Sequence, residues 1–151
     1  LVGATKNIKN YHISDKQEEL ILKKIKESNV QSTVLVKDFT RETEQYFENS
    51  KIFVLPADIV FCNFALLEAM MRGLTPVISN VEGANIIVEN NKSGLIRAIN
   101  AEEFANAIIY LLQNDQLRIE MGIEARKQIL LNFNSELLAS QLITFYKTHL
   151  W

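Results

Sequence analysis

Residues 52–78, IFVLPADIVFCNFALLEAMMRGLTPVI, decide the fold. Two apolar runs, Ile52–Leu55 and Pro76–Ile78, flank a predicted helix, Asn63–Arg72, that ends at Gly73. The runs do not alternate with polar residues, which is typical of strands covered on both faces. Glycine commonly follows the last turn of a helix. The stretch therefore predicts a strand–helix–strand unit of a parallel sheet.

The same alternation of strands and helices continues on both sides. Further strands are predicted at Leu1–Gly3, Thr33–Val36 and Gly94–Ile96. Further helices are predicted at Asp15–Ser28, Thr40–Asn49, Gly83–Asn90, Ala101–Gln113, Leu117–Leu131 and Ser135–His149. We therefore expect an α/β fold, a doubly wound, Rossmann-like parallel sheet flanked by helices, in one domain over residues 1–151. Because the chain starts as if at the end of a strand, we expect this domain to be truncated at its N-terminal edge.

The composition suits a globular domain with a full core. Of its 151 residues, 48% are hydrophobic and 23% are charged. The formal net charge of −2 gives no sign of a nucleic-acid groove. Cys62 is the single cysteine, which excludes an intrachain disulfide and fits a reducing, cytoplasmic location. We find no clustered set of metal-ligating residues and no apolar run long enough to span a bilayer.

A ligand is expected at the carboxyl ends of the strands, where open parallel sheets bind their ligands. The loop Asp58–Asn63 lies there, and the helix after it offers unpaired backbone amides and a positive dipole end to a phosphate. Glu68 is the only charge between Asp58 and Arg72. It either accepts hydrogen bonds from ribose hydroxyls or pairs with Arg72 at i, i+4, and the residues alone favour the ion pair by about two to one. After the next strand, Gly83 either allows close approach of a ligand or forms an ordinary turn.

These segments resemble the C-terminal domain of group 1, family 4-like, retaining glycosyltransferases of the GT-B fold. The resemblance rests on Leu55-Pro56, on Glu68-Ala69-Met70, on Gly73 and on Pro76-Val77-Ile78, in this order. It continues through Glu82–Ile96 and through the closing helices, and so covers almost the whole chain.

The resemblance implies a domain that binds a UDP- or GDP-sugar. Joined to its missing N-terminal domain, it would transfer a hexose to an acceptor with retention, as in bacterial polysaccharide synthesis. The resemblance implies that the isolated chain is inactive. It implies no cofactor and no tightly held metal. It is also compatible with peripheral membrane contact through the full-length protein. No catalytic residue is assigned here. The implied donor-binding residues are Glu68 for the ribose and Asp58, Cys62, Asn63, Phe64, Ala65 and Gly83 for the diphosphate and sugar, with Lys37 and Asp38 near the base.

Two departures from the family pattern keep a second hypothesis open. Val60 stands where the motif has its first glutamate, and Ile86 stands where the next loop has another. Asp58 is a candidate substitute for the first. The second hypothesis is a non-catalytic domain with a structural or regulatory role, and a sugar-nucleotide epimerase of the same fold is a third, less favoured one.

Other polar and aromatic residues have simpler interpretations. We expect Arg118 and Arg126 to lie on a solvated helix face, and Cys62 to be a small packing residue. Tyr146 and Trp151 either pack on the partner domain or belong to a frayed tail.

Overall fold

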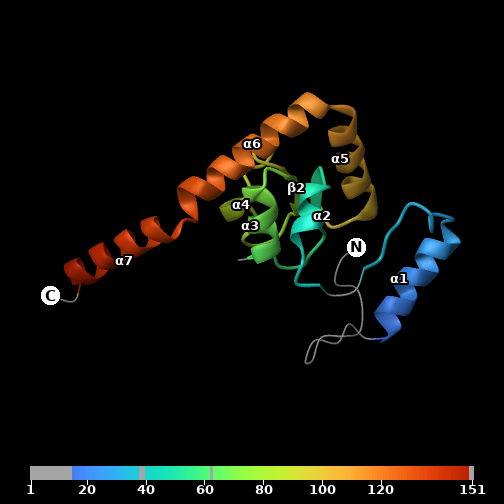
Figure 1. Ribbon diagram of the computed structural model, residues 1–151, viewed down its shortest axis with the longest axis horizontal. Coiled ribbons are helices and arrows are strands. Elements are labelled where there is room, and N and C mark those ends of the chain that lie inside the picture. The colour runs from blue at the N-terminus through green and yellow to red at the C-terminus, as the bar shows by residue number, and fades with distance from the viewer. Residues whose placement is uncertain (1–14, 38–39, 62, 150–151) are drawn as a thin grey trace. The chain divides into compact units, whose positions relative to one another are not determined.

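A computed structural model describes residues 15–37, 40–61 and 63–149 (Figure 1). Contacts between residues divide the chain into two compact units, Leu1–Gln45 and Tyr46–Trp151. In the first unit, α1 (Asp15–Glu27) is followed by a turn. The strand predicted at Thr33–Val36 is wrong, because Thr33 and Val34 both donate backbone hydrogen bonds to the Val30 carbonyl, 3.0 Å away. The predicted strand Leu1–Gly3 lies outside the described residues.

The second unit contains a three-stranded parallel sheet. Its strands are β1 (Ile52–Leu55), β2 (Thr75–Ser79) and β3 (Leu95–Arg97), in the order β1-β2-β3. Val54 pairs with Val77, and Val77 pairs with Leu95 on the other side. The helices α3 (Phe64–Met71) and α4 (Ala84–Ile87) connect the strands. This arrangement confirms the predicted Rossmann-like α/β fold.

Four further helices complete the described part of the chain. They are α2 (Glu44–Glu48), α5 (Ala101–Gln113), α6 (Asp115–Asn132) and α7 (Ser135–His149). The first is shorter than the predicted helix Thr40–Asn49, because the Thr40 hydroxyl accepts the Glu42 N–H at 3.0 Å and forms a turn. Within the described ranges, none of the helices combines the length and the hydropathy needed to cross a bilayer.

Apolar side chains cover both faces of the sheet. Consecutive residues of a strand point to opposite faces, and Val77 and Ile78 accordingly belong to different core clusters. Ile78 packs in a cluster with residues of α3 and α4, whereas Val77 packs in a cluster with residues of α5. The helix α6 serves both clusters, through Met121 on one side and Ile129 on the other. The sheet is thereby held in place from both faces.

The contact of α6 with the end of α3 depends on a pair of glycines. A Cβ placed on Gly122 would lie only 2.1 Å from the Gly73 carbonyl oxygen, so the two backbones touch. Gly73 itself has φ +79°, which ends α3 in the left-handed conformation that favours glycine. One turn before Gly122, the carbonyl of Arg118 accepts a 2.6 Å hydrogen bond from the Thr75 hydroxyl. These contacts fix α6 against the amino end of β2.

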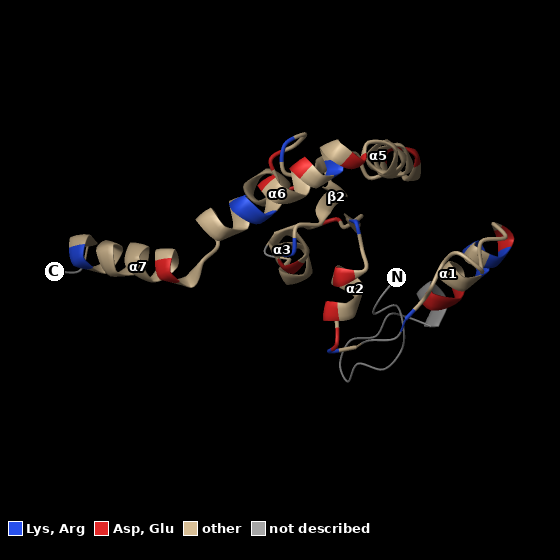
Figure 2. Ribbon diagram, turned by 45° about the horizontal axis from the view of Figure 1, so that its top comes forward, with Lys and Arg blue, Asp and Glu red and all other residues tan. Residues whose placement is uncertain are grey.

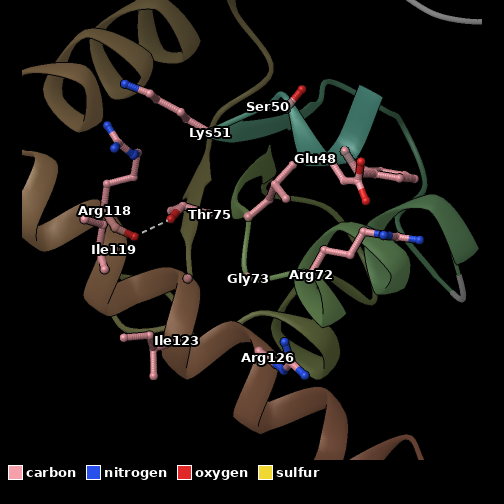
Figure 3. A pocket seen from close by; sticks show the side chains of 13 residues that line it. Glu48, Ser50, Lys51, Arg72, Gly73, Thr75, Arg118, Ile119, Ile123 and Arg126 are labelled. Atoms are coloured by element: carbon pink, nitrogen blue, oxygen red, sulfur yellow. Dashed lines mark hydrogen bonds between the residues drawn. The ribbon is translucent and has the colours of Figure 1, made fainter. Parts of the chain in front are cut away.

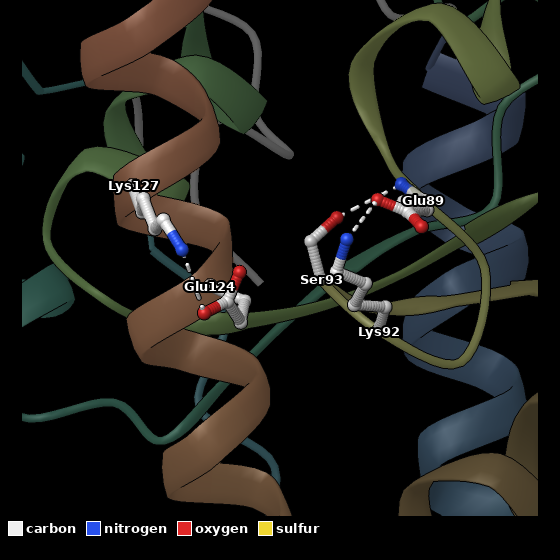
Figure 4. A network of polar contacts seen from close by, with 5 residues as sticks. All are labelled: Glu89, Lys92, Ser93, Glu124 and Lys127. Carbon is white, nitrogen blue, oxygen red and sulfur yellow. Dashed lines mark hydrogen bonds and ion pairs between the residues drawn. The ribbon is translucent and has the colours of Figure 1, made fainter.

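Polar contacts close the turn that leads into β3 (Figure 4). The Glu89 N–H donates to the Ser93 hydroxyl at 2.8 Å, and the Lys92 ammonium donates to the Glu89 carboxylate at 2.9 Å. That carboxylate raises the pKa of Lys92, by hydrogen bonding first and by its charge second. The neighbouring pair on α6, Lys127 and Glu124, is 3.4 Å apart. The charged partners lie at the surface, whereas Ser93 is buried, and we assign this group a structural role.

Candidate functional site

The N-terminus of α3 lies at the carboxyl edge of the sheet, as predicted. Asn63 caps the helix, because its side-chain oxygen accepts the Leu66 N–H at 3.0 Å. The Asn63 carbonyl accepts the Leu67 N–H at 3.1 Å. Among the described residues, the Phe64 and Ala65 amides have no acceptor, and both residues are exposed. The first turn carries no acidic side chain. These two amides and the helix dipole therefore form a ready place for an anion.

Glu68 lies on the exposed face of the same helix. The residues that α3 buries are Leu66, Ala69 and Met70, whereas Phe64, Ala65 and Glu68 are exposed. Glu68 follows Phe64 by four residues, so one helical turn of about 5.4 Å separates the carboxylate from the unpaired amides. It is the single charge on α3 (Figure 2). The Arg72 guanidinium lies over the Phe47 ring, 5.7 Å from its centroid.

The loop before α3 divides into an exposed part and a buried part. Asp58 is exposed, and it is free to reach a ligand in the solvent in front of the loop. Val60 is fully buried and packs with Leu66, Ile78 and Ile87. The position of the motif's first glutamate is thus part of the core, and a carboxylate there would be costly to bury. Cys62, predicted both as a site residue and as a packing residue, lies outside the described residues, as does Asp38.

Gly83 brings the second loop of the site against the first. It has φ +84° and occupies the cap position of α4. A Cβ placed there would lie 3.2 Å from the Phe61 Cα. The close approach seen at Gly83 is to the loop after β1, and the close approach of a ligand stays a prediction.

Large apolar side chains stand exposed around this edge, and of these Phe64 alone was named from the sequence as a site residue. The exposed fraction is 81% for Phe64, 65% for Phe61 and 64% for Ile86. Such grouped apolar surface is uncommon unless a ligand or a partner covers it. The signal in the sequence was the run Ile59–Phe61, which is too bulky for an ordinary solvated loop.

A cavity of about 620 Å³ lies elsewhere, at the amino edge of the sheet (Figure 3). One of its lining residues corrects a prediction: Arg118, expected on a solvated face, is buried to all but 7% of its surface. Its guanidinium donates to the Asp115 carboxylate, which allows the charge to be buried. Arg126 is exposed, as expected. In the described parts of the chain, no group of three or more His, Cys, Asp or Glu residues is placed to hold a metal ion.

The comparisons with known proteins decide the family. The family model described as "Glycosyl transferases group 1" matches residues 2–128, most of the chain. The chain belongs to the group 1 glycosyltransferases. This membership confirms the resemblance found in the sequence.

Curated relatives of this glycosyltransferase chain are much longer than the chain itself. The poly(ribitol-phosphate) alpha-N-acetylglucosaminyltransferase of Staphylococcus aureus is 26% identical over 98% of this chain and 31% of its own length. The UDP-Gal:alpha-D-GlcNAc-diphosphoundecaprenol alpha-1,3-galactosyltransferase of Escherichia coli is 29% identical over 70% of this chain and 27% of its own. The chain thus spans about a third of the length of these relatives.

A solved structure shows the same fold. Anabaena HepE in complex with UDP superimposes with a TM-score of 0.82 at 16% identity, over 88% of this chain and 37% of that protein. At 16% identity, this likeness shows the fold alone, which is the Rossmann-like fold of GT-B glycosyltransferases. The roles of Glu68, Asp58, Asn63, Phe64, Ala65 and Gly83 stay predictions from the residues and their geometry.

Proposed function

We propose that this chain is the donor-binding domain of a retaining glycosyltransferase that uses a nucleotide diphosphate sugar. Joined to an N-terminal domain of the same kind, it would transfer a hexose to an acceptor, without a cofactor or a tightly held metal. A single observation carries the proposal. The Phe64 and Ala65 amides, which lack an acceptor among the described residues, lie on the same exposed face of α3 as the Glu68 carboxylate, one turn further along.

The chemistry of this pairing fits a nucleotide diphosphate. The amides at a helix N-terminus donate hydrogen bonds to phosphate oxygens and present the positive end of the dipole. A carboxylate accepts hydrogen bonds from the two adjacent hydroxyls of a ribose, and such charge-assisted bonds are strong. Asp58 and Gly83 lie in the two loops beside the helix, where they would contact the sugar.

We propose UDP as the nucleotide. The name of the Escherichia coli relative includes UDP-Gal, and HepE was solved with UDP. The sugar would be a hexose or an N-acetylhexosamine, the groups named in the two relatives. The cytoplasm, where nucleotide sugars are made, would be the location of such a domain.

Calorimetric titration with UDP and with GDP tests the proposal. We expect UDP to bind more tightly, and the Glu68→Gln variant to weaken UDP binding about tenfold, because a charged acceptor of two hydrogen bonds is lost. Glu136→Gln removes an exposed glutamate from α7 and serves as the matched control. Equal affinities for UDP in the wild type and Glu68→Gln would refute the ribose assignment.

A second candidate function is a non-catalytic domain of the same fold. One observation favours it. Val60, at the position of the motif's first glutamate, is completely buried in the core. This candidate predicts UDP binding without sugar transfer. Measured turnover of a UDP-sugar by the full-length protein would exclude it.

A further inference from the structure

The cavity at the amino edge of the sheet has a volume of about 620 Å³, within the range of small-molecule pockets. It lies between the start of β1, the start of β2, the end of α3 and the first half of α6 (Figure 3). Because parallel strands all run in one direction, this edge is opposite to the one that carries the N-terminus of α3. The proposed donor site therefore does not use this cavity.

The cavity is lined with positive charge although the whole chain is slightly acidic. The charged side chains in its wall are four cations and one anion: Lys51, Arg72, Arg118, Arg126 and Glu48. The formal net charge of the chain is −2. A local excess of cations in a hollow attracts anions more strongly than the same charges spread over a flat surface.

The Arg118 guanidinium has more N–H donors than it has hydrogen-bond partners. Its side chain is 8% exposed, and a guanidinium carries five N–H donors. Within the described residues, Asp115 is the one acceptor of this guanidinium, and the Asp115 side chain is itself 67% exposed. The other N–H groups of this guanidinium can be reached by solvent, because none of its nitrogens is a buried atom without a partner. A ligand with several oxygens would accept hydrogen bonds from them.

Lys51 is placed to assist Arg118. Both side chains line the cavity, and Figure 3 shows them extending to the same side of it, whereas Arg72 extends to the opposite side. Lys51 and Arg126 are exposed, and neither forms an ion pair with another described residue. The wall between them includes Ile119 and Ile123, which are 52% and 60% exposed.

We propose that this cavity binds a phosphate group, with Arg118 as the oriented donor and Lys51 and Arg126 as supporting charges. The planar fork of a guanidinium matches two phosphate oxygens, and an ammonium adds a point charge. The apolar wall of Ile119 and Ile123 suits the organic part of the ligand. That ligand is either a soluble phosphate ester or a phospholipid headgroup, which share this chemistry.

A titration of the ¹⁵N-labelled protein with inorganic pyrophosphate, followed by two-dimensional NMR, tests the site. We expect shifts of the Lys51, Gly73 and Gly122 amides. Lys51→Gln should weaken binding about threefold, as for an exposed charge, and Arg118→Gln about tenfold or more. Lys127→Gln lies on the same helix outside this cavity and should change nothing. Arg118→Lys keeps the charge and loses the planar guanidinium, so its pyrophosphate affinity should lie between those of the wild type and Arg118→Gln. A melting curve of each variant tests whether the fold is kept.

Vesicles distinguish the two sources of phosphate. Co-sedimentation with phosphatidylglycerol but not phosphatidylcholine vesicles, reduced by Lys51→Gln, would assign a lipid headgroup. Pyrophosphate shifts without vesicle binding would assign a soluble ester. Shifts confined to residues 63–66 and Gly83, or equal affinities in Lys51→Gln, Arg126→Gln and wild type, would overturn the proposal. Because this result concerns the amino edge alone, it leaves UDP binding at the other edge untouched.

Discussion

Gly83 packs directly against the backbone of Phe61, so closely that a methyl group on Gly83 would have to push Phe61 aside by a few tenths of an ångström. A Cβ on Gly83 would lie 3.2 Å from the Phe61 Cα and 3.3 Å from its nitrogen. The contact joins the loop after β2 to the loop after β1, the two loops to which we assign the donor's diphosphate and sugar. The spacing of the proposed site therefore depends on the absence of one methyl group.

Gly83→Ala should lower both stability and UDP affinity. The left-handed φ costs alanine about 1 kcal/mol, and the crowding against Phe61 adds about 1 kcal/mol more. Gly73→Ala is the matched control, because its φ is +79° but its nearest new neighbour, the Gly122 oxygen, is 3.8 Å away. Urea unfolding and UDP titration measure both effects. Equal losses of stability in the two variants would show that the Phe61 contact is unimportant.

Gly122→Ala should be strongly destabilising. Its Cβ would lie 2.1 Å from the Gly73 carbonyl oxygen, and neither partner is a movable side chain. The helix α6 would have to withdraw from α3, at a cost of about 3 kcal/mol. Ile123→Ala, at the neighbouring exposed position, should cost less than about 1 kcal/mol. A Gly122→Ala protein that unfolds at the wild-type urea concentration would contradict this packing.

Asn63→Ala should separate stability from ligand binding. Removing this cap leaves the Leu66 amide without its acceptor and should cost about 1 kcal/mol. Asn100 caps α5 in the same way, through the Glu103 N–H at 2.8 Å. Both variants should melt at similarly lowered temperatures, but only Asn63→Ala should also weaken UDP binding. Equal UDP affinities in the two variants would argue against a phosphate at α3.

The Lys92–Glu89 ion pair should contribute little to the free energy of unfolding, even at pH values below the pKa of Lys92. Its pKa is raised above the ordinary 10.5 by Glu89, so the ion pair is intact at neutral pH and is lost only as the pH rises through the raised value. Both partners are exposed, where ion pairs contribute little. We therefore expect Lys92→Met and wild type to melt at the same temperature at pH 7 and at pH 9. A clear difference at pH 7 would show a buried role that the structure does not suggest.

The sequence predicted those elements whose signals are local. The apolar run Ile52–Leu55 is a strand, and α3 lies within the predicted range Asn63–Arg72 and ends before Gly73. The strand at Thr33–Val36 failed, because a strand needs a hydrogen-bonded neighbour, and here the local turn to Val30 uses the donors. Whether residues 1–151 form one domain stays a prediction.

Those parts of the site that depend on local sequence spacing could also be predicted. Helix periodicity places Glu68 on the face of Phe64, so their proximity follows from spacing alone. The contact of Gly83 with Phe61 and the burial of Val60 and Arg118 depend on which elements pack together, which no local pattern specifies. Arg118 gave a weak signal in retrospect, because Asp115 precedes it by three residues on the same helix.

No residue of α7 is buried, although its fifteen residues include Leu138, Leu142 and Phe145. A helix of this length without tertiary support is only marginally stable in water. Deuterium should therefore replace the amide hydrogens of α7 much faster than those of α6, which is anchored in both core clusters. Removing residues 135–151 should accordingly leave the cooperative unfolding of the sheet unchanged, because no residue of α7 belongs to the two core clusters that cover the sheet.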